Sequence, residues 1–297
     1  MGDFWGGGDL LKLKMPQKYD LHTHFFTNWD KGKYSLERHE RSLKYILNAM
    51  KKEGLDGIVL ANGGSEGGWK DAYEQLTLQI KDKERLGEYT LVKKIDNALE
   101  FADDKKLYKI IKGQEVLTKQ GHIIAIGLNY GKIIPSRLEL ETALKEIKSL
   151  GGVSDAAHAP VFLGIGIKNL KKYKELIDVW EAKNMNYENS LLRFKLGVNP
   201  SIEEADEIAK QLGINWIAVS DCHNKKDLGN GQIEIENLDF SSANNLRASL
   251  RYFLVSGKFT SIIKRANSLT SVLGHMIIYS YDIHIRNKVR LVTLESC

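Results

Sequence analysis

Short runs of apolar residues alternate along the chain with longer segments in which apolar positions recur at helical spacing. Such runs are typical of buried strands, and recurrence every three or four residues is typical of amphipathic helices. The pattern predicts strands near 18–22 and at 57–61, 108–116, 122–128, 153–157, 176–181, 214–220 and 232–238. It predicts helices at 35–53, 136–150, shortly after 157, and at 201–212, 243–256 and 260–278, with a polar helical region ending about residue 104.

Two of the predicted helices have a local start signal. Ser136–Glu139 and Ser201–Glu204 both show the Ser-x-x-Glu spacing of a capping box. In that arrangement the serine and glutamate side chains each accept a hydrogen bond from a backbone N–H group that the helix leaves unpaired. We therefore expect a helix to begin at each of these serines.

The order of the elements indicates an α/β fold. Strands that alternate with amphipathic helices form a mostly parallel sheet, and about seven such units favour a closed barrel over an open sheet. No G-x-G-x-x-G follows the first strand, which argues against a dinucleotide-binding fold. We expect three parts: an N-terminal arm at 1–17, a barrel domain at 18–240, and a helical extension at 241–297 packed on the barrel.

Histidines and acids gather at the ends of the predicted strands. His22 and His24 are two residues apart in an extended segment, so their side chains point to the same face. Barrel enzymes place their chemistry at the carboxyl ends of strands. The other candidates that follow predicted strands are Glu115, His122, His158, Glu181, Asp221 and His223.

This mixture of imidazoles and carboxylates is suited to zinc, manganese or iron, whereas calcium and magnesium prefer oxygen ligands. Glu115 and Asp221 supply negative charge that can hold two divalent ions close together. Two ions about 3.5–4 Å apart can share a hydroxide and stabilise an in-line displacement at phosphorus. On this basis the expected nucleophile is metal-bound water and not a side chain.

Two other sources of catalysis are less favoured. Cys222 lies between Asp221 and His223, and alternation along the strand end would point its thiol away from them. The glycine-rich loop Gly63–Gly68 lacks the Gly-Lys-Ser/Thr ending of a phosphate-binding P-loop. We interpret that loop as a flexible segment at the barrel mouth.

Composition limits the possible partners and the compartment. The net charge of +5 comes from 43 basic and 38 acidic side chains without any block of like charge, so it neither favours nor excludes a nucleic-acid partner. Two cysteines are too few for a disulfide framework. The N-terminus lacks a signal-peptide layout, and no apolar run reaches the roughly 18–20 residues that span a membrane. We expect a cytoplasmic protein without a membrane partner, and its oligomeric state is not indicated.

The ordered motifs resemble those of the PHP superfamily, the polymerase and histidinol phosphatase group of metal-dependent phosphoesterases. The resemblance covers about residues 18–224, some two thirds of the chain. The motifs that carry it are Asp20–His24, Gly54–Leu60, Gly113–Val116 with Gly121–Ile123, Ala157–Pro160 and Ser220–His223.

The resemblance implies a distorted (β/α)7 TIM-like barrel of PHP type that holds two or three divalent metal ions. By motif, the ligands of one ion would be His22, His24, Glu115 and Asp221. Glu115 would bridge to a second ion held by His122 and His158. A third ion would need His223, a residue such as Asp30, and an Asp-His pair. This chain has Ala61-Asn62-Gly63 in place of the usual Thr-Asp-His, so we expect the third site to be damaged.

The implied activity is hydrolysis of a phosphate ester in a small molecule, a nucleotide or a nucleic-acid end by a metal-bound hydroxide. Asp30 and His223 are the candidates for the acid that protonates the leaving group. One alternative is a metal-binding PHP module with weakened or lost catalysis and a scaffold or binding role. A less favoured alternative is an amidohydrolase-type barrel, whose usual bridging carboxylated lysine is here Glu115.

Overall fold

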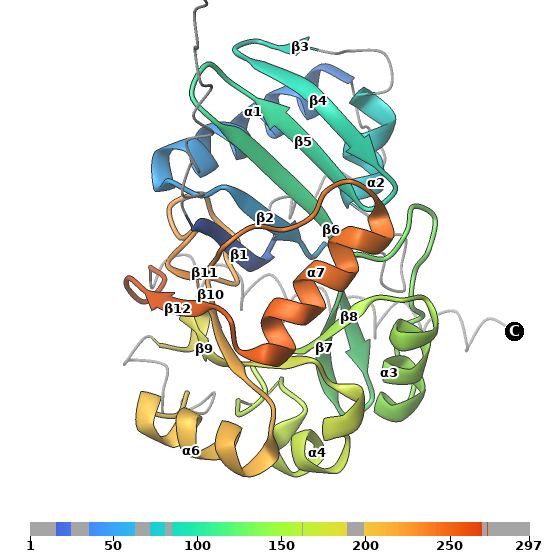
Figure 1. The fold of residues 1–297 in the computed structure, drawn as a ribbon, viewed down its shortest axis with the longest axis vertical. Helices are drawn as coiled ribbons and strands as arrows, with labels where there is room; N and C mark the ends of the chain where they lie inside the picture. The colour runs from blue at the N-terminus through green and yellow to red at the C-terminus, as the bar shows by residue number, and fades with distance from the viewer. Residues whose placement is uncertain are drawn as a thin grey trace, which may run out of the picture.

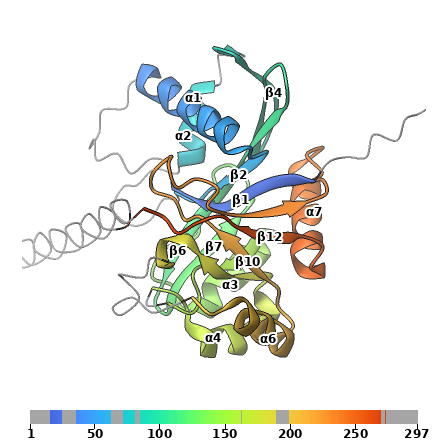
Figure 2. The ribbon, with the colours of Figure 1, turned by 90° about the vertical axis from the view of Figure 1, so that its left-hand side faces the viewer.

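Strands from most of the chain form one sheet that curves into a nearly closed barrel (Figures 1 and 2). In this computed structural model the described residues are 16–24, 36–62, 72–80, 85–161, 163–188, 199–268 and 272. Asp30, the glycine-rich loop and most of the predicted N-terminal arm lie outside them. No helix among the described residues combines the length and the apolar character needed to cross a bilayer.

The strands are β1 Gln17–Thr23, β2 Gly57–Leu60, β3 Arg85–Leu86, β4 Tyr89–Ile95, β5 Ala98–Ala102, β6 Leu107–Thr118, β7 Gly121–Ile126, β8 Val153–Ala156, β9 Val179–Asn184, β10 Trp216–Val219, β11 Gly231–Ile235 and β12 Thr260–Ile263. The helices are α1 Leu36–Glu53, α2 Ala72–Gln79, α3 Leu140–Ser149, α4 Gly166–Lys172, α6 Ile202–Leu212 and α7 Ala243–Ser256. The short 3-10 helices η2 Lys174–Leu176 and η3 Met185–Tyr187 flank β9.

The barrel sheet has the order β10-β9-β8-β7-β6-β2-β1-β11-β12. The pairs β1/β2, β2/β6, β8/β9 and β9/β10 are parallel, as predicted, whereas β7, β11 and β12 run antiparallel to their neighbours. The sheet is therefore mixed, and the barrel departs from a regular alternation of parallel strands and helices.

Strand β6 is shared between the barrel and a smaller antiparallel sheet. Its first half pairs with β2 and β5, and its second half pairs with β7. At the crossing point Gly113 lies so close to Val59 that a Cβ on Gly113 would be 2.4 Å from the valine side chain. Glycine at this position therefore lets β6 pass from one set of partners to the other.

The predicted polar helical region is wrong between residues 85 and 104, where the chain forms β3, β4 and β5. Residues that face the protein interior recur there every second position, as in the buried Tyr89 and partly buried Leu91 of β4 and the buried Leu99 and Phe101 of β5. Asp96-Asn97 forms the two-residue turn between β4 and β5. The buried side of this hairpin packs on α1 and α2 in one apolar cluster.

Two other predicted elements are corrected by the structure, and one helix start is confirmed. Helix α3 begins at Leu140 and not at Ser136, because Arg137 has φ +63° and donates its N–H to the carbonyl of Leu117. Residues 260–263 form β12 instead of the start of a helix, and they pair with β11. The capping box at Ser201 is present, with both reciprocal bonds to Glu204.

Helix α7 has the predicted bounds and closes one end of the barrel (Figure 1). Its buried residues Leu246, Leu250 and Leu254 share an apolar cluster with side chains from strands of the barrel interior. The division of the chain at residues 17 and 240 stays a prediction.

The barrel closes where the end of β1 meets the segment after β10. Thr23 and Cys222 form a bridge, His24 N donates to the Cys222 carbonyl at 2.8 Å, and Asp221 N donates to the His22 carbonyl at 2.9 Å. The buried Asp20 carboxylate accepts bonds from Ser220 N at 3.1 Å and Gly229 N at 2.9 Å. One side chain of β1 therefore fixes both ends of the loop that follows β10.

We expect Asp20→Ala to lower the free energy of unfolding by at least about 2 kcal/mol, because it leaves buried N–H groups without acceptors. Urea unfolding in the presence of a chelator measures this without any contribution from metal. Asp104→Ala, at an exposed position, serves as the control and should change little. Equal unfolding midpoints for the two variants would contradict a role for Asp20 in closure.

Candidate metal centre

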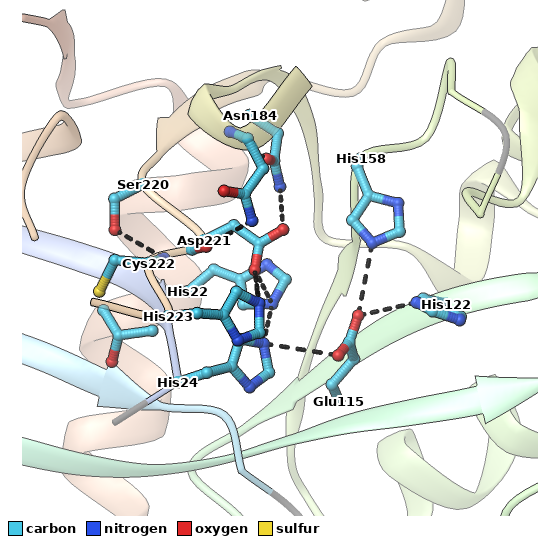
Figure 3. A network of polar contacts seen from close by, with 12 residues as sticks. His22, His24, Glu115, His122, His158, Asn184, Ser220, Asp221, Cys222 and His223 are labelled. Atoms are coloured by element: carbon cyan, nitrogen blue, oxygen red, sulfur yellow. Dashed lines mark hydrogen bonds and ion pairs between the residues drawn. The ribbon is translucent and has the colours of Figure 1, made fainter. Parts of the chain in front are cut away.

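The structure brings the seven predicted metal ligands together at one edge of the barrel (Figure 3). They come from the end of β1, from β6 and β7, and from the segments after β8 and β10. Six of them form two groups whose ligand atoms lie within 4.8 Å of one another. The first ligand group is His22, His24 and Asp221, and the second ligand group is Glu115, His122 and His158.

In the first ligand group, three donor atoms surround one point. His22 Nε2 and His24 Nε2 are 2.8 Å apart, and each is 3.5 Å from Asp221 Oδ1. With zinc–nitrogen distances of about 2.0–2.1 Å, two ligand atoms of a tetrahedral zinc site are about 3.3–3.4 Å apart. The observed separations of 2.8 Å and 3.5 Å lie on either side of this value, so the three donor atoms could surround a divalent ion.

The second ligand group is linked to the first through the Glu115 carboxylate. Glu115 Oε1 is 2.8 Å from His122 Nδ1 and 3.4 Å from His158 Nε2. Its other oxygen, Oε2, is 3.4 Å from His24 Nε2. One carboxylate therefore presents one oxygen to each group, which is the arrangement that a ligand shared by two ions requires.

Glu181, fully buried on β9, orients residues of both groups. Its Oε1 is 2.6 Å from His22 Nδ1, which directs Nε2 of the same ring toward His24 and Asp221. Its Oε2 accepts bonds from His158 N at 2.7 Å and from Asn184 Nδ2 at 2.9 Å.

Asparagines fix the orientation of Asp221. Asn184 Nδ2 donates to Asp221 Oδ2 at 3.1 Å, and Asn186 Nδ2 donates to the Asp221 carbonyl at 2.6 Å. Asp221 Oδ1 is left to face the histidines. Asp221 and His158 have φ values of +49° and +32°, a conformation that costs about 1–3 kcal/mol for a residue other than glycine. The hydrogen bonds at both residues hold the backbone in this conformation.

The electrostatic environment favours the metal-binding protonation states of His24, Glu115 and Asp221, but not that of His22. Burial and the nearby His223 hold the pKa of His24 well below its usual range, so its imidazole is neutral. Burial acts to raise the pKa values of Glu115 and Asp221, but neighbouring histidines outweigh it and hold both values low. Burial acts to lower the pKa of His22, but the carboxylates of Glu181 and Asp221 raise it, so an ion at Nε2 would displace a proton.

His223 lies beside the first ligand group but outside it. Its Nε2 is 3.4 Å from Asp221 Oδ1, and its ring stacks on that of His24 with centroids 4.6 Å apart. Of the other residues considered for a third ion, Asp30 and Gly63 lie outside the described residues, and Asn62 has an uncharged side chain. The Cys222 thiol is buried among apolar side chains, and burial raises its pKa, which disfavours it as a nucleophile.

The sequence did not indicate which residues surround the ligands. Glu181 was recognised at a strand end, but its bonds to His22 and His158 were not foreseen. Asn184 and Asn186 were missed, and β9, whose sequence VWEAKN contains two charged residues before Asn184, gives no local signal for it. Tyr187, whose ring centroid is 5.2 Å from that of His158, was also missed.

Comparison with known proteins supports the resemblance. Residues 200–252 match a family model described as "PHP-associated". This segment runs from the start of α6 through β10 and β11 into α7, and it includes Asp221 and His223. The match confirms the resemblance to the PHP superfamily over its associated C-terminal part. Together with the two ligand groups, it indicates a PHP-type metal-binding protein.

The fold is similar to that in the crystal structure of PsfC from Pseudomonas syringae PB-5123. The TM-score is 0.55 at 14% sequence identity, over 91% of this chain and 99% of PsfC. At this identity the similarity shows a shared fold alone. No match was found among curated proteins.

We expect Glu181→Gln to weaken zinc binding about 10–100-fold. Glu181 accepts three hydrogen bonds, and the N–H groups of a glutamine amide would face one of those three donors without an acceptor. Competition with a chromophoric zinc chelator measures the affinity, and circular dichroism checks the fold. Glu175→Gln, at an exposed position before β9, is the matched control. Unchanged zinc affinity in Glu181→Gln would show that this carboxylate does not orient the ligands.

Proposed function

We propose that this protein is a metal-dependent phosphoesterase with a dinuclear centre in a PHP-type (β/α)7 barrel. The observation that carries the proposal is the position of Glu115, whose two oxygens face the two ligand groups separately. His22, His24 and Asp221 would hold one ion, and His122 and His158 the other. The donor set is suited to zinc, manganese or iron.

Two bound ions would lower the pKa of a water molecule and neutralise charge that develops at phosphorus. The residues of the chain would contribute in other ways. Glu115 would link the two metal sites through its two oxygens. Glu181 would hold the His22 ring and the His158 backbone in place. The low pKa values of Glu115 and Asp221 keep both carboxylates ionised at neutral pH.

A phosphate ester also needs a proton donor for its leaving group. His223 is a candidate because its Nε2 adjoins Asp221 of the first ligand group and its side chain is partly exposed. Asp30 is the second candidate, and it lies outside the described residues. The substrate would be a phosphorylated small molecule, a nucleotide or a nucleic-acid end.

A second candidate function is a metal-binding module without catalysis. The observation that favours it is Ala61-Asn62-Gly63, which replaces charged residues expected from the resemblance by an amide and a glycine. An amidohydrolase-type activity ranks last, because a glutamate and not a carboxylated lysine faces both groups.

We expect Glu115→Ala to lower phosphatase activity at least about 100-fold and to lower the metal content, because it removes the carboxylate that both groups share. Turnover of p-nitrophenyl phosphate with zinc and with manganese, together with elemental analysis, measures both effects. Glu146→Ala, on the exposed face of α3, is the control.

The same assays on the unaltered protein separate the candidate functions. About two equivalents of metal with turnover support the phosphoesterase. Two equivalents without turnover of aryl phosphates, nucleotides or oligonucleotides favour the module, and turnover of esters or amides instead favours the amidohydrolase. Hydrolysis that persists unchanged in Glu115→Ala would contradict the dinuclear mechanism.

A further inference from the structure

The segment that follows β12 lies against the loop that follows β10. Because β11 is antiparallel to both β1 and β12, β1 and β12 end at the same edge of the barrel (Figure 2). There Lys264 N donates to the Asn230 carbonyl at 2.7 Å, and Ser268 N donates to Asp227 Oδ1 at 3.0 Å. Residues 265–267, between these two bonds, therefore run alongside the loop that carries one of the candidate ligands.

Asn267 is the point at which this segment enters the protein interior, and it is only 2% exposed. Its Nδ2 donates to the Ser220 carbonyl at 2.8 Å and to Asn186 Oδ1 at 2.7 Å. Its Oδ1 accepts a bond from Asn230 Nδ2 at 2.9 Å, and its backbone N–H donates to the Met185 carbonyl at 3.0 Å. Both N–H groups and the oxygen of this amide are therefore engaged, which fixes the side chain in one orientation.

The partners of Asn267 belong to the two peptide units that flank Asp221. In the peptide unit before Asp221, Asn267 Nδ2 holds the Ser220 carbonyl. The N–H group of the same unit donates to the His22 carbonyl at 2.9 Å. In the peptide unit after it, the Asp221 carbonyl accepts from Asn186, whose own amide oxygen accepts from Asn267. The orientations of these two units define φ and ψ of Asp221, so Asn267 acts on both.

These backbone angles decide where the Asp221 carboxylate points. Asp221 has φ +49°, a conformation that is unfavourable for a residue with a side chain, so it persists only where surrounding bonds hold it. Its Oδ1 is 3.5 Å from the Nε2 atoms of both His22 and His24. If either peptide unit were free to turn, the carboxylate would move relative to the two rings, and the first ligand group would lose its geometry.

We infer that Asn267 is a positioning residue for the first ligand group. It holds the backbone of Asp221 in the left-handed conformation, and it thereby makes the segment after β12 a part of the metal site. The match to the family model ends at residue 252, so Asn267 lies outside the part of the chain that the model covers. This inference rests on the metal centre of the proposed function but not on its phosphate chemistry.

The test compares the zinc affinity of Asn267→Ala with that of the matched control Asn97→Ala. Asn97 is also buried, and its Nδ2 also donates to two carbonyl oxygens, those of Gly127 at 2.8 Å and Ala243 at 3.3 Å. We expect the affinity to fall about tenfold in Asn267→Ala and to stay unchanged in the control. Competition with a chromophoric zinc chelator measures the affinity, and circular dichroism checks the fold of both variants.

Combination with ligand variants shows whether Asn267 acts through Asp221. Substitutions that act through one residue are not additive, whereas those at independent sites add. In an Asp221→Ala background, Asn267→Ala should have little further effect on zinc affinity. In a His122→Ala background, which alters the second ligand group, it should keep its tenfold effect. Equal effects in the two backgrounds would show that the substitution disturbs the fold as a whole, and they would overturn the inference.

Asn267→Asp is the second variant, for the case in which Asn267→Ala does not fold. It is nearly isosteric and has fewer N–H or O–H donors than the amide. Any negative charge that it adds near the site would by itself strengthen cation binding. Weaker zinc binding by Asn267→Asp would therefore support the positioning role, and unchanged or tighter binding would overturn it.

Zinc affinity needs no turnover, so failure of this inference and failure of the proposed function are distinguishable. Tenfold weaker binding by Asn267→Ala in a protein that hydrolyses no phosphate ester would support the positioning role and count against the phosphoesterase. Equal affinities of Asn267→Ala and Asn97→Ala in a protein that does hydrolyse phosphate esters would overturn the positioning role alone. Absence of zinc binding by the unaltered protein would overturn both.

Discussion

The candidate site depends on the hydrogen bonds of one buried carboxylate, Glu181. A carboxylate without solvent must be satisfied by donors, and Glu181 takes them from His22, His158 and Asn184. These donors belong to the end of β1, the turn after β8 and the end of β9, so one side chain sets the positions of three segments. Asp155, on the neighbouring strand, is equally buried. Burial and the charge of Glu181 raise the pKa of Asp155, which favours the neutral form of Asp155 beside the Glu181 carboxylate.

The contacts that close the barrel also arrange the candidate ligands. The backbone bonds between the end of β1 and the segment after β10 join His22 to Asp221 and His24 to Cys222. His22, His24 and Asp221 are thereby placed in one group by main-chain geometry before any ion binds. These bonds offset the cost of the left-handed conformation of Asp221, and the bond from His158 N to Glu181 offsets that of His158. An ion that binds the folded chain but not the unfolded chain would therefore also stabilise the closed barrel.

The sequence predicted which residues gather at the candidate site better than it predicted the fold around them. The spacing of His22 and His24, the position of Glu115 near the end of an apolar strand and that of Asp221 after one are local features, so the pattern could show them. The strands at 85–104 were missed because most of their exposed residues are polar or charged. This composition is also typical of an exposed helix, and it hides the alternation of buried and exposed positions. The strand at 260–263 is short, and only pairing with β11 decides between helix and strand. The role of Glu181 depends on donors 23 and 159 residues away, which no local pattern contains.

A charge count shows how much positive charge the proposed dinuclear centre could offer a substrate. Two divalent ions would bring four positive charges, against which Glu115, Asp221 and Glu181 bring three negative ones. The remaining surplus is one charge, less than a phosphate monoester dianion carries. A third ion would add two more, but Asn62 is neutral and Gly63 has no side chain with which to hold it. In the proposed dinuclear centre, further positive charge for a dianionic substrate would therefore have to come from side chains of the protein.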